Sequence, residues 1–338
     1  MEKIGIIGMG LIGTSLGLAM KQTGMKNVQI VGTDRERGHA SKAQRMGAVD
    51  RVEGNMMGAV KDAQVVIIAT PVMATKEILE VIGPRLRDGC LVTDTGGSKG
   101  VVMEWAEQYL PKTVSFVGGH PMVGKDGSGP EAADASIFQN RAYCVIPAKG
   151  ADRDAVKLLT EMISAIGAKA YFIGVAEHDS FVSAVSHLPT LLSVALVGCT
   201  SKSPSWSDIA QVATTQYGEI TSPASNEPIT NRDLFFSADE GIIHWIDAFI
   251  RELQELRLIL AADGEGKLKA LEEVFTHAYE ARNRWLVGAV EPGSKETTKP
   301  YIPSASETFT TLFTGDSSAR RRIFGWGEGR GKDTRRDK

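Results

Sequence analysis

Residues 3–20, KIGIIGMGLIGTSLGLAM, carry the pattern that decides the fold. Gly8, Gly10 and Gly13 form a G-x-G-x-x-G motif that follows an apolar, β-branched run and opens a helix-forming run. In such a strand–turn–helix unit the first glycine allows a tight turn, the second lets the backbone approach a pyrophosphate, and the third lets the helix pack closely on the strand. The amides at the start of the helix then face the phosphates. The stretch therefore predicts a dinucleotide-binding unit.

An acidic residue at the end of the next strand supports this interpretation. Asp34 ends the run VQIVGTD, 21 residues after Gly13, where this fold places an acid that binds the adenosine ribose and repels a 2′-phosphate. This favours NAD over NADP, although Arg35 beside it could pair with such a phosphate. The loop that follows AQVVIIATP is expected to line the nicotinamide side. The predicted cofactor-binding residues are Gly8, Gly10, Leu11, Ile12, Gly13, Asp34, Arg35, Thr70 and Pro71.

Short apolar runs alternate with helical stretches throughout residues 1–174. Most of the runs are continuously apolar, as expected for strands whose two faces are both covered by helices. Their alternation with helices predicts a Rossmann-type, doubly wound parallel sheet in an α/β domain. The predicted strands are KIGIIGM, VQIVGTD, AQVVIIATP, CLVTDTG, VSFVGG, AYCVIPA and KAYFIG.

From residue 175 the pattern becomes helical. One long, largely apolar helix is expected, interrupted by Pro189, and apolar side chains from Ile242 to Leu256 recur at helical spacing. We expect an all-α domain over residues 175–290, whose apolar stripes face either their own domain or a second copy of the chain. Residues 291–338 predict a flexible extension, and contact of its basic end with a partner is the alternative.

Composition limits the class of protein. The 338 residues are 42% hydrophobic and 23% charged with a net charge of −3, so no global charge favours nucleic acid or an anionic membrane. Cys90, Cys144 and Cys199 show no metal-ligand or redox spacing, which is typical of a reducing cytoplasm. The N-terminus does not read as a signal peptide, and no continuous apolar run reaches the roughly 18 residues of a membrane span. We expect a cytoplasmic protein without a metal site, a membrane partner or a nucleic-acid partner.

Three later segments contain motifs that are similar to those of a known protein family. They are DTGGSKG at 94–100, GHPMVGKDGSG at 119–129 and AEHDSFVSAVSHLP at 176–189. Together with the glycine motif they resemble the prephenate/arogenate dehydrogenase family over about residues 1–260. The resemblance implies NAD-dependent oxidative decarboxylation of a small-molecule cyclohexadienol to a phenol in tyrosine biosynthesis. It also implies a homodimer built through the helical domain.

His120 is the main candidate for the chemistry. By residue type alone it could be an ordinary loop histidine, but the resemblance makes it catalytic. A neutral imidazole can accept the proton of the ring hydroxyl as that hydroxyl becomes a carbonyl. The resemblance also places His187 and Ser186 at the substrate, and Ser98 next to the position of a family serine.

Two departures from the family pattern concern the substrate. The family's serine falls on Gly97, and its carboxylate-binding arginine aligns with Ser222. Because serine cannot replace a bidentate guanidinium, another cation is expected, with Lys125 and Arg232 as the candidates. Prephenate, arogenate and an aminated analogue therefore stay open. So do a 3-hydroxyacid or imine dehydrogenase, and a nucleotide-binding relative without catalysis.

Overall fold

The computed structural model describes residues 2–124, 127–237 and 240–288. The chain divides into two compact units, Met1–Phe249 and Ile250–Lys338, which are described separately. The first unit contains the whole sheet and the part of the chain that follows it as far as Phe249. The predicted cofactor site and His120 therefore lie within one unit.

A single eight-stranded sheet forms the centre of the first unit, with the order β3-β2-β1-β4-β5-β6-β7-β8. Neighbouring strands run parallel except for β6 and β7, which are antiparallel. The strands are β1 (Glu2–Ile7), β2 (Val28–Thr33), β3 (Arg51–Val52), β4 (Val65–Ile68), β5 (Leu91–Asp94), β6 (Ser115–Pro121), β7 (Ala142–Pro147) and β8 (Lys169–Phe172).

The predicted fold class is confirmed, and each of the seven predicted runs contains a strand. Two features differ from the expectation. Strand β3 has two residues and leaves no apolar run to detect. Strand β7 runs antiparallel because the described part of the β6–β7 connection forms two short 3₁₀ turns, η2 (Pro130–Ala132) and η3 (Ala135–Phe138), and not a crossover helix.

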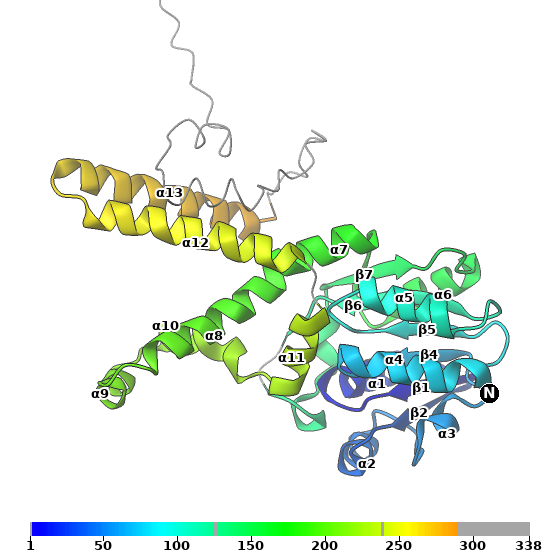
Figure 1. The fold of residues 1–338 in the computed structure, drawn as a ribbon. Coiled ribbons are helices and arrows are strands. Elements are labelled where there is room, and N and C mark those ends of the chain that lie inside the picture. Colours follow the sequence, from blue (N-terminus) through cyan, green and yellow to red (C-terminus); the bar gives the residue numbers. More distant parts are fainter. Residues whose placement is uncertain (1, 125–126, 238–239, 289–338) are drawn as a thin grey trace, which may run out of the picture. The chain divides into compact units, whose positions relative to one another are not determined.

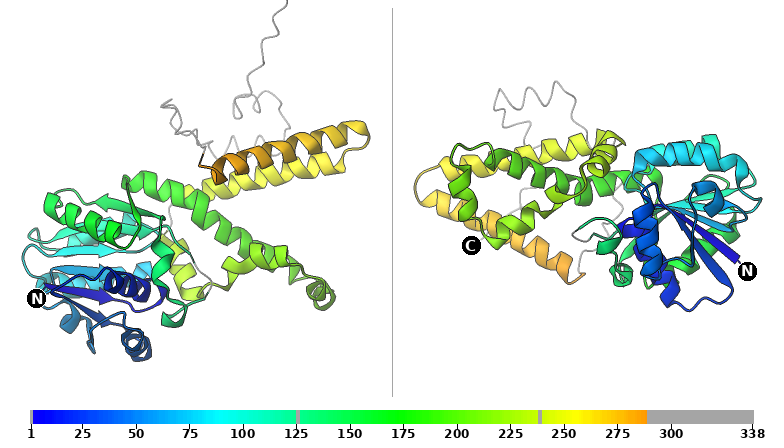
Figure 2. Two further views of the ribbon diagram at one scale, coloured as in Figure 1. Left: turned by 180° about the vertical axis from the view of Figure 1, so that it is seen from behind. Right: turned by 90° about the horizontal axis from the view of Figure 1, so that it is seen from below.

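Helices cover both faces of the sheet (Figures 1 and 2). On one face Leu16 and Ile163 belong to a core that also takes in apolar strand residues. On the other face Leu79 and Val102 belong to a second core. The first group of helices is α1 (Leu11–Gln22), α2 (Arg37–Arg45) and α6 (Arg153–Ala165), and the second is α3 (Met56–Val60), α4 (Val72–Ile82) with the 3₁₀ turn η1 (Gly83–Arg85), and α5 (Gly100–Tyr109).

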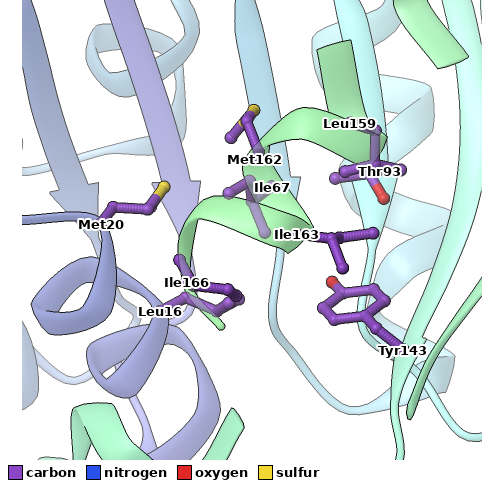
Figure 3. A pocket seen from close by; sticks show the side chains of 9 residues that line it. All are labelled: Leu16, Met20, Ile67, Thr93, Tyr143, Leu159, Met162, Ile163 and Ile166. Atoms are coloured by element: carbon purple, nitrogen blue, oxygen red, sulfur yellow. The ribbon is translucent and has the colours of Figure 1, made fainter. Parts of the chain in front are cut away.

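The first core contains one small gap between α1, α6 and the sheet (Figure 3). Its volume is about 20 Å³, and its lining is mostly apolar. The hydroxyl groups of Thr93 and Tyr143 are polar exceptions in that lining. A space of this size is comparable to a single water molecule, so the gap belongs to the core and is no ligand site.

A long helical segment follows the sheet. It consists of α7 (Val175–Val182), the π-helical turn η4 (Ser183–His187) and α8 (Leu188–Thr200). The helix continues through Pro189, where the sequence predicts an interruption. A wide π turn directly before the proline offers room for its ring. The remaining helices are α9 (Trp206–Gln211), α10 (Thr215–Thr221), η5 (Ser222–Ser225), α11 (Pro228–Ser237), α12 (Glu240–Ala261) and α13 (Glu265–Leu286).

The segment Val175–Thr200 is long and apolar enough to cross a membrane by length and composition, with a mean hydropathy of 1.7. Only 22% of its most apolar window is buried within this chain. Taken alone this is weak evidence for a membrane, because core helices of water-soluble proteins meet the same criterion. The sequence expectation of no membrane span therefore stays a prediction.

The second unit contains the end of α12 and all of α13. The apolar spacing from Ile242 to Leu256 predicts α12, and α13 lies within the expected all-α region. Many of their apolar side chains are exposed in the single chain, namely Ile250, Leu253, Leu258, Leu260, Leu268, Phe275, Tyr279, Trp285 and Leu286. The predicted extension, residues 291–338, lies outside the described residues.

Two glycines in helices provide a matched test of the packing. A Cβ on Gly17 in α1 would lie 2.5 Å from the carbonyl oxygen of Ala48, whereas a Cβ on Gly38 in α2 would meet nothing within 4 Å. We expect Gly17→Ala to destabilise the protein by about 1–3 kcal/mol through overpacking. Gly38→Ala should be neutral or stabilise it by up to about 1 kcal/mol through helix propensity. Urea unfolding of both variants measures this, and equal effects would contradict the packing of α1.

Candidate active site

The glycine motif forms the turn between β1 and α1. Gly8 has φ +97°, and a Cβ on Gly13 would lie 1.9 Å from the Gly8 carbonyl oxygen. Close packing therefore requires glycine at both positions. A Cβ on Gly10 would meet nothing within 4 Å, so this glycine borders open space at the start of α1.

Two side chains at the carboxyl ends of the strands face this turn. After β2, Asp34 Oδ2 accepts the Met9 N–H at 2.6 Å and Oδ1 accepts the Glu36 N–H at 2.7 Å. After β4, the hydroxyl oxygen of Thr70 is buried and has no hydrogen-bond partner among the described residues. The side chain of Arg35 is exposed, and its Nε lies 3.8 Å from a carboxylate oxygen of Glu36.

These residues fit a nicotinamide dinucleotide. Leu11 and Ile12 form the first turn of α1, whose N-cap makes no side-chain hydrogen bond. Their amides and the open space at Gly10 leave room for a pyrophosphate, so their role in binding the cofactor stays a prediction. Thr70 adds a buried hydroxyl that needs a partner, and Pro71 begins α4 beside it.

His120 lies in β6, not in the loop that its neighbouring glycines suggest. A Cβ on Gly119 would lie 2.6 Å from the Asp94 carbonyl oxygen, and one on Gly118 would lie 3.2 Å from Lys99 Cδ. The two glycines therefore let β6 pack directly against the end of β5 and the stem of Lys99. This close packing sets the position of His120, the next residue.

Asp94 and Lys99 form a buried ion pair next to Gly118 and Gly119 of β6. Their side chains are 1% and 0% exposed, and Lys99 Nζ donates to Asp94 Oδ2. Asp94 also accepts the N–H of Gly96 at 2.8 Å and of Gly119 at 3.2 Å. Because buried charges are costly unless they are paired and hydrogen-bonded, the pair holds the loop after β5 to β6 in one arrangement.

Two histidines and an aspartate form a chain of hydrogen bonds. His120 Nδ1 lies 3.0 Å from His178 Nε2, and His178 Nδ1 lies 2.7 Å from Asp179 Oδ1. A carboxylate can only accept, so His178 Nδ1 carries a proton and donates it. In the neutral form of both rings, His178 Nε2 then accepts from His120 Nδ1. The remaining nitrogen, His120 Nε2, has a free lone pair.

The carboxylate of Asp179 is itself fixed by the backbone. Oδ1 accepts the N–H of Lys99 at 2.9 Å, and Oδ2 accepts the N–H of Gly100 at 2.8 Å. Burial by itself raises the pKa of Asp179, but the hydrogen bonds from His178, Gly100 and Lys99 outweigh burial and leave this pKa below its ordinary value. Asp179 is therefore an ionised acceptor at neutral pH.

The surroundings of His120 keep its imidazole neutral. Burial lowers the pKa of His120 well below 6.5, and the electrostatic interactions with Lys99, His178 and His187 lower it further. A Cβ on Gly97 would lie 3.8 Å from His120 Nε2 and 3.0 Å from Leu234 Cδ1. A side chain at position 97, where the family has a serine, would therefore lie next to both the free nitrogen of His120 and Leu234 of α11.

Three other predicted site residues lie in the loop between β5 and α5 and in the turn η4. The Ser98 hydroxyl donates to the Ser237 carbonyl at 3.2 Å. His187 is buried in η4, with its ring edge-on to Phe235 at 5.9 Å between centroids. Ser186 lies in the same turn and is half-buried. Their roles at the substrate stay predictions.

The two cations predicted to bind the substrate carboxylate, Arg232 and Lys125, are placed less clearly than His120. The guanidinium of Arg232 donates from Nε at 2.9 Å and from Nη2 at 2.6 Å to Asp233 Oδ1, and its side chain is 69% exposed. Ser222 begins the turn η5. Lys125 lies outside the described residues. Within the described ranges, no group of three or more His, Cys, Asp or Glu side chains is placed to hold a metal.

Comparison with known proteins agrees with this geometry. A glycine turn suited to a dinucleotide, in the same unit as a half-buried imidazole with a free nitrogen, is an arrangement of nicotinamide-dependent dehydrogenases. Residues 16–172 match the family model "Prephenate dehydrogenase, nucleotide-binding domain", and residues 175–276 match "Prephenate dehydrogenase, dimerization domain". The chain belongs to the prephenate dehydrogenase family.

Individual relatives point the same way. Prephenate dehydrogenase of Bacillus subtilis is 34% identical over 260 residues, which are 76% of this chain and 69% of the relative. Cyclohexadienyl dehydrogenase of Zymomonas mobilis is 27% identical over 80% of this chain and 93% of the relative. The crystal structure of A. aeolicus prephenate dehydrogenase in complex with hydroxyphenyl propionate and NAD⁺ is 27% identical, with a TM-score of 0.74 over 83% of this chain and 98% of that one.

The depressed pKa of His120 can be measured directly. In an NMR titration of histidine-labelled protein, we expect His120 to stay neutral from alkaline pH to well below 6.5, because a lowered pKa moves protonation to more acidic pH. Lys99→Met should move the His120 pKa upward, since it removes a positive neighbour and leaves Asp94 unpaired. Lys21→Met, which breaks the Lys21–Asp50 pair elsewhere in the sheet domain, is the matched control. A His120 pKa at or above 6.5 in the unchanged protein would contradict the buried site.

Proposed function

We propose that the chain catalyses the NAD-dependent oxidative decarboxylation of prephenate or arogenate to a phenol, in tyrosine biosynthesis. One observation carries the proposal: the hydrogen-bond chain through His178 leaves His120 Nε2 as a proton acceptor at the carboxyl edge of a dinucleotide-binding sheet. The names of the relatives from Bacillus subtilis and Zymomonas mobilis support the substrate class. The NAD⁺ complex of the A. aeolicus enzyme supports the cofactor.

The proposed chemistry depends on the position of one proton. NAD, when bound, supplies the acceptor for the hydride of the ring carbon that bears the hydroxyl group. His120 Nε2 accepts the hydroxyl proton as the C–O bond becomes a carbonyl. The ring carboxylate then leaves as carbon dioxide, and its bonding electrons complete an aromatic ring and turn the carbonyl into a phenolate, which takes a proton to give the phenol. Lys99 and the neighbouring histidines favour a neutral His120, which is the form that can accept this proton.

Asp34 is the proposed determinant of the cofactor. Its carboxylate is tied to the glycine turn through the Met9 amide, which holds a negative charge beside the predicted ribose site. A 2′-phosphate there would meet that charge at close range, whereas ribose hydroxyls could donate to it. We therefore favour NAD, with NADP as the less preferred cofactor.

The substrate's ring carboxylate needs a cation, and Ser222 cannot supply one. On the basis of the sequence, the proposed cations for this carboxylate are Lys125 and Arg232. Lys125 lies five residues after His120. The double hydrogen bond of Arg232 to Asp233 engages part of its guanidinium and leaves the rest exposed. The ammonium of a lysine, or a guanidinium that also binds Asp233, would bind the carboxylate more weakly than an arginine that is free to form two hydrogen bonds with it.

We also propose a cytoplasmic homodimer formed through the helical region. The match to a dimerization domain and the exposed apolar side chains of α12 and α13 support this assembly. Such a row of apolar side chains is usually covered in the functional state.

A related cyclohexadienol is the second candidate substrate. The observation that favours it is Gly97, whose missing side chain changes the surroundings of the reacting hydroxyl relative to the family pattern. NADH formation with prephenate, arogenate and an aminated prephenate analogue distinguishes the candidates. Turnover of none of the three would contradict the proposed function.

His120→Asn tests the proposed proton acceptor. We expect turnover to fall by about 10²–10⁴, the usual contribution of a positioned general base, with NAD affinity near normal. Steady-state kinetics and NAD titration measure the two quantities. His277→Asn on the exposed surface of α13 is the control and should keep full turnover. Substantial activity in His120→Asn would return His120 to a structural role.

Asp34→Ser tests the cofactor assignment. The unchanged protein should bind NAD much more tightly than NADP. The substitution should narrow that difference, because it removes an acceptor for the ribose and the repulsion of the phosphate. Fluorescence titration with both reduced cofactors measures the ratio. Equal affinities in the unchanged protein would show that Asp34 does not select the cofactor.

A further inference from the structure

One carboxylate joins the histidine pair to the start of helix α5. Asp179 Oδ1 lies 2.7 Å from His178 Nδ1 and 2.9 Å from the Lys99 amide, and Oδ2 lies 2.8 Å from the Gly100 amide. The three donors come from two elements about 80 residues apart in the chain. They hold the carboxylate in a single orientation, with one oxygen facing His178.

The orientation of that oxygen decides which nitrogen of His120 is free. A neutral imidazole exists as two tautomers, and the hydrogen bond at one nitrogen selects the proton position at the other. If His178 carried its proton on Nε2, it would donate to His120 Nδ1. His120 would then carry its own proton on Nε2 and present a donor, not an acceptor, to the substrate hydroxyl.

We propose that Asp179 is a positioning residue for the reaction: it fixes His178 in the tautomer that leaves His120 Nε2 as the proton acceptor. This inference rests on the proposed function. The same carboxylate ties α7 to the loop that carries Gly97, which borders His120. This second contact supports the fold, whereas the proposed role of Asp179 in the reaction is to set the proton position on the imidazole pair.

Substitution of Asp179 gives the first test. Asp179→Ala should lower kcat by about 10- to 1,000-fold, in line with the loss of a group that orients a catalytic histidine, with little change in the KM for NAD. Asp179→Asn should recover only part of the lost turnover, because its NH2 group takes the place of one accepting oxygen and must face either the Gly100 amide or His178 Nδ1. The control is Asp152→Ala, which removes a carboxylate that accepts the Asp154 amide at the start of α6, and kcat should not change. Full turnover in Asp179→Ala would overturn the proposal.

A double-mutant cycle separates positioning from support of the fold. If Asp179 acts through His178, adding Asp179→Ala to His178→Phe should leave kcat almost as it is in His178→Phe alone. A role confined to holding α5 would give multiplying losses, and that result would overturn the proposal. Thermal unfolding of each variant measures the structural contribution separately.

The proton position can be observed without substrate. Nitrogen NMR of labelled protein should show His120 protonated at Nδ1 in the unchanged protein and in a mixture of tautomers in Asp179→Ala. If Asp179→Ala does not fold, the unchanged protein and Asp179→Asn still decide the point, and a proton on His120 Nε2 in the unchanged protein would overturn the inference. Lack of turnover of prephenate and arogenate would instead contradict the proposed function, whatever the tautomer.

Discussion

The buried ion pair between Asp94 and Lys99 is the interaction on which the active site depends. Two charges in the interior are tolerated because Asp94 also accepts the amides of Gly96 and Gly119. Removing one partner of such a pair typically costs about 3–5 kcal/mol, so the loop after β5 and strand β6 are strongly held together. His120 directly follows Gly119, so its position derives from this arrangement; its lowered pKa derives first from burial and then from the nearby Lys99.

The fold could be predicted because its signals are local. Continuous apolar runs indicate strands covered on both faces, and the glycines at positions 8 and 13 occupy places where a Cβ would strike the backbone. The direction of β7 could not be predicted, because it depends on how the chain returns from β6. The two residues of β3 could not be predicted either, since its pairing with β2 is set by that neighbour and not by its own composition.

The site was predicted only in part. His120 and the cofactor residues lie in short motifs with a recognisable chemistry, whereas His178, Asp179 and Lys99 were not singled out. The segment EHD contains a usable signal, an acid next to a histidine, but the partners of Asp179 lie about 80 residues away. From the sequence alone, Lys99 is interpreted as a solvent-exposed lysine. Only the structure shows that its aliphatic side chain packs against Gly118. Contacts of this kind arise from the tertiary structure and leave no periodic pattern in the sequence.

The π-helical turn at Ser183–His187 has a geometric consequence for the imidazoles of this helix. His178 and His187 are nine positions apart, which is about two and a half turns of a regular α-helix, so they would point in opposite directions. A π turn absorbs about one extra residue and rotates the later part of the helix by about 100°. That rotation brings His187 toward the side of His178, and both rings contribute to the lowered pKa of His120. The π turn therefore lets one helical segment place two imidazoles, His178 and His187, toward His120.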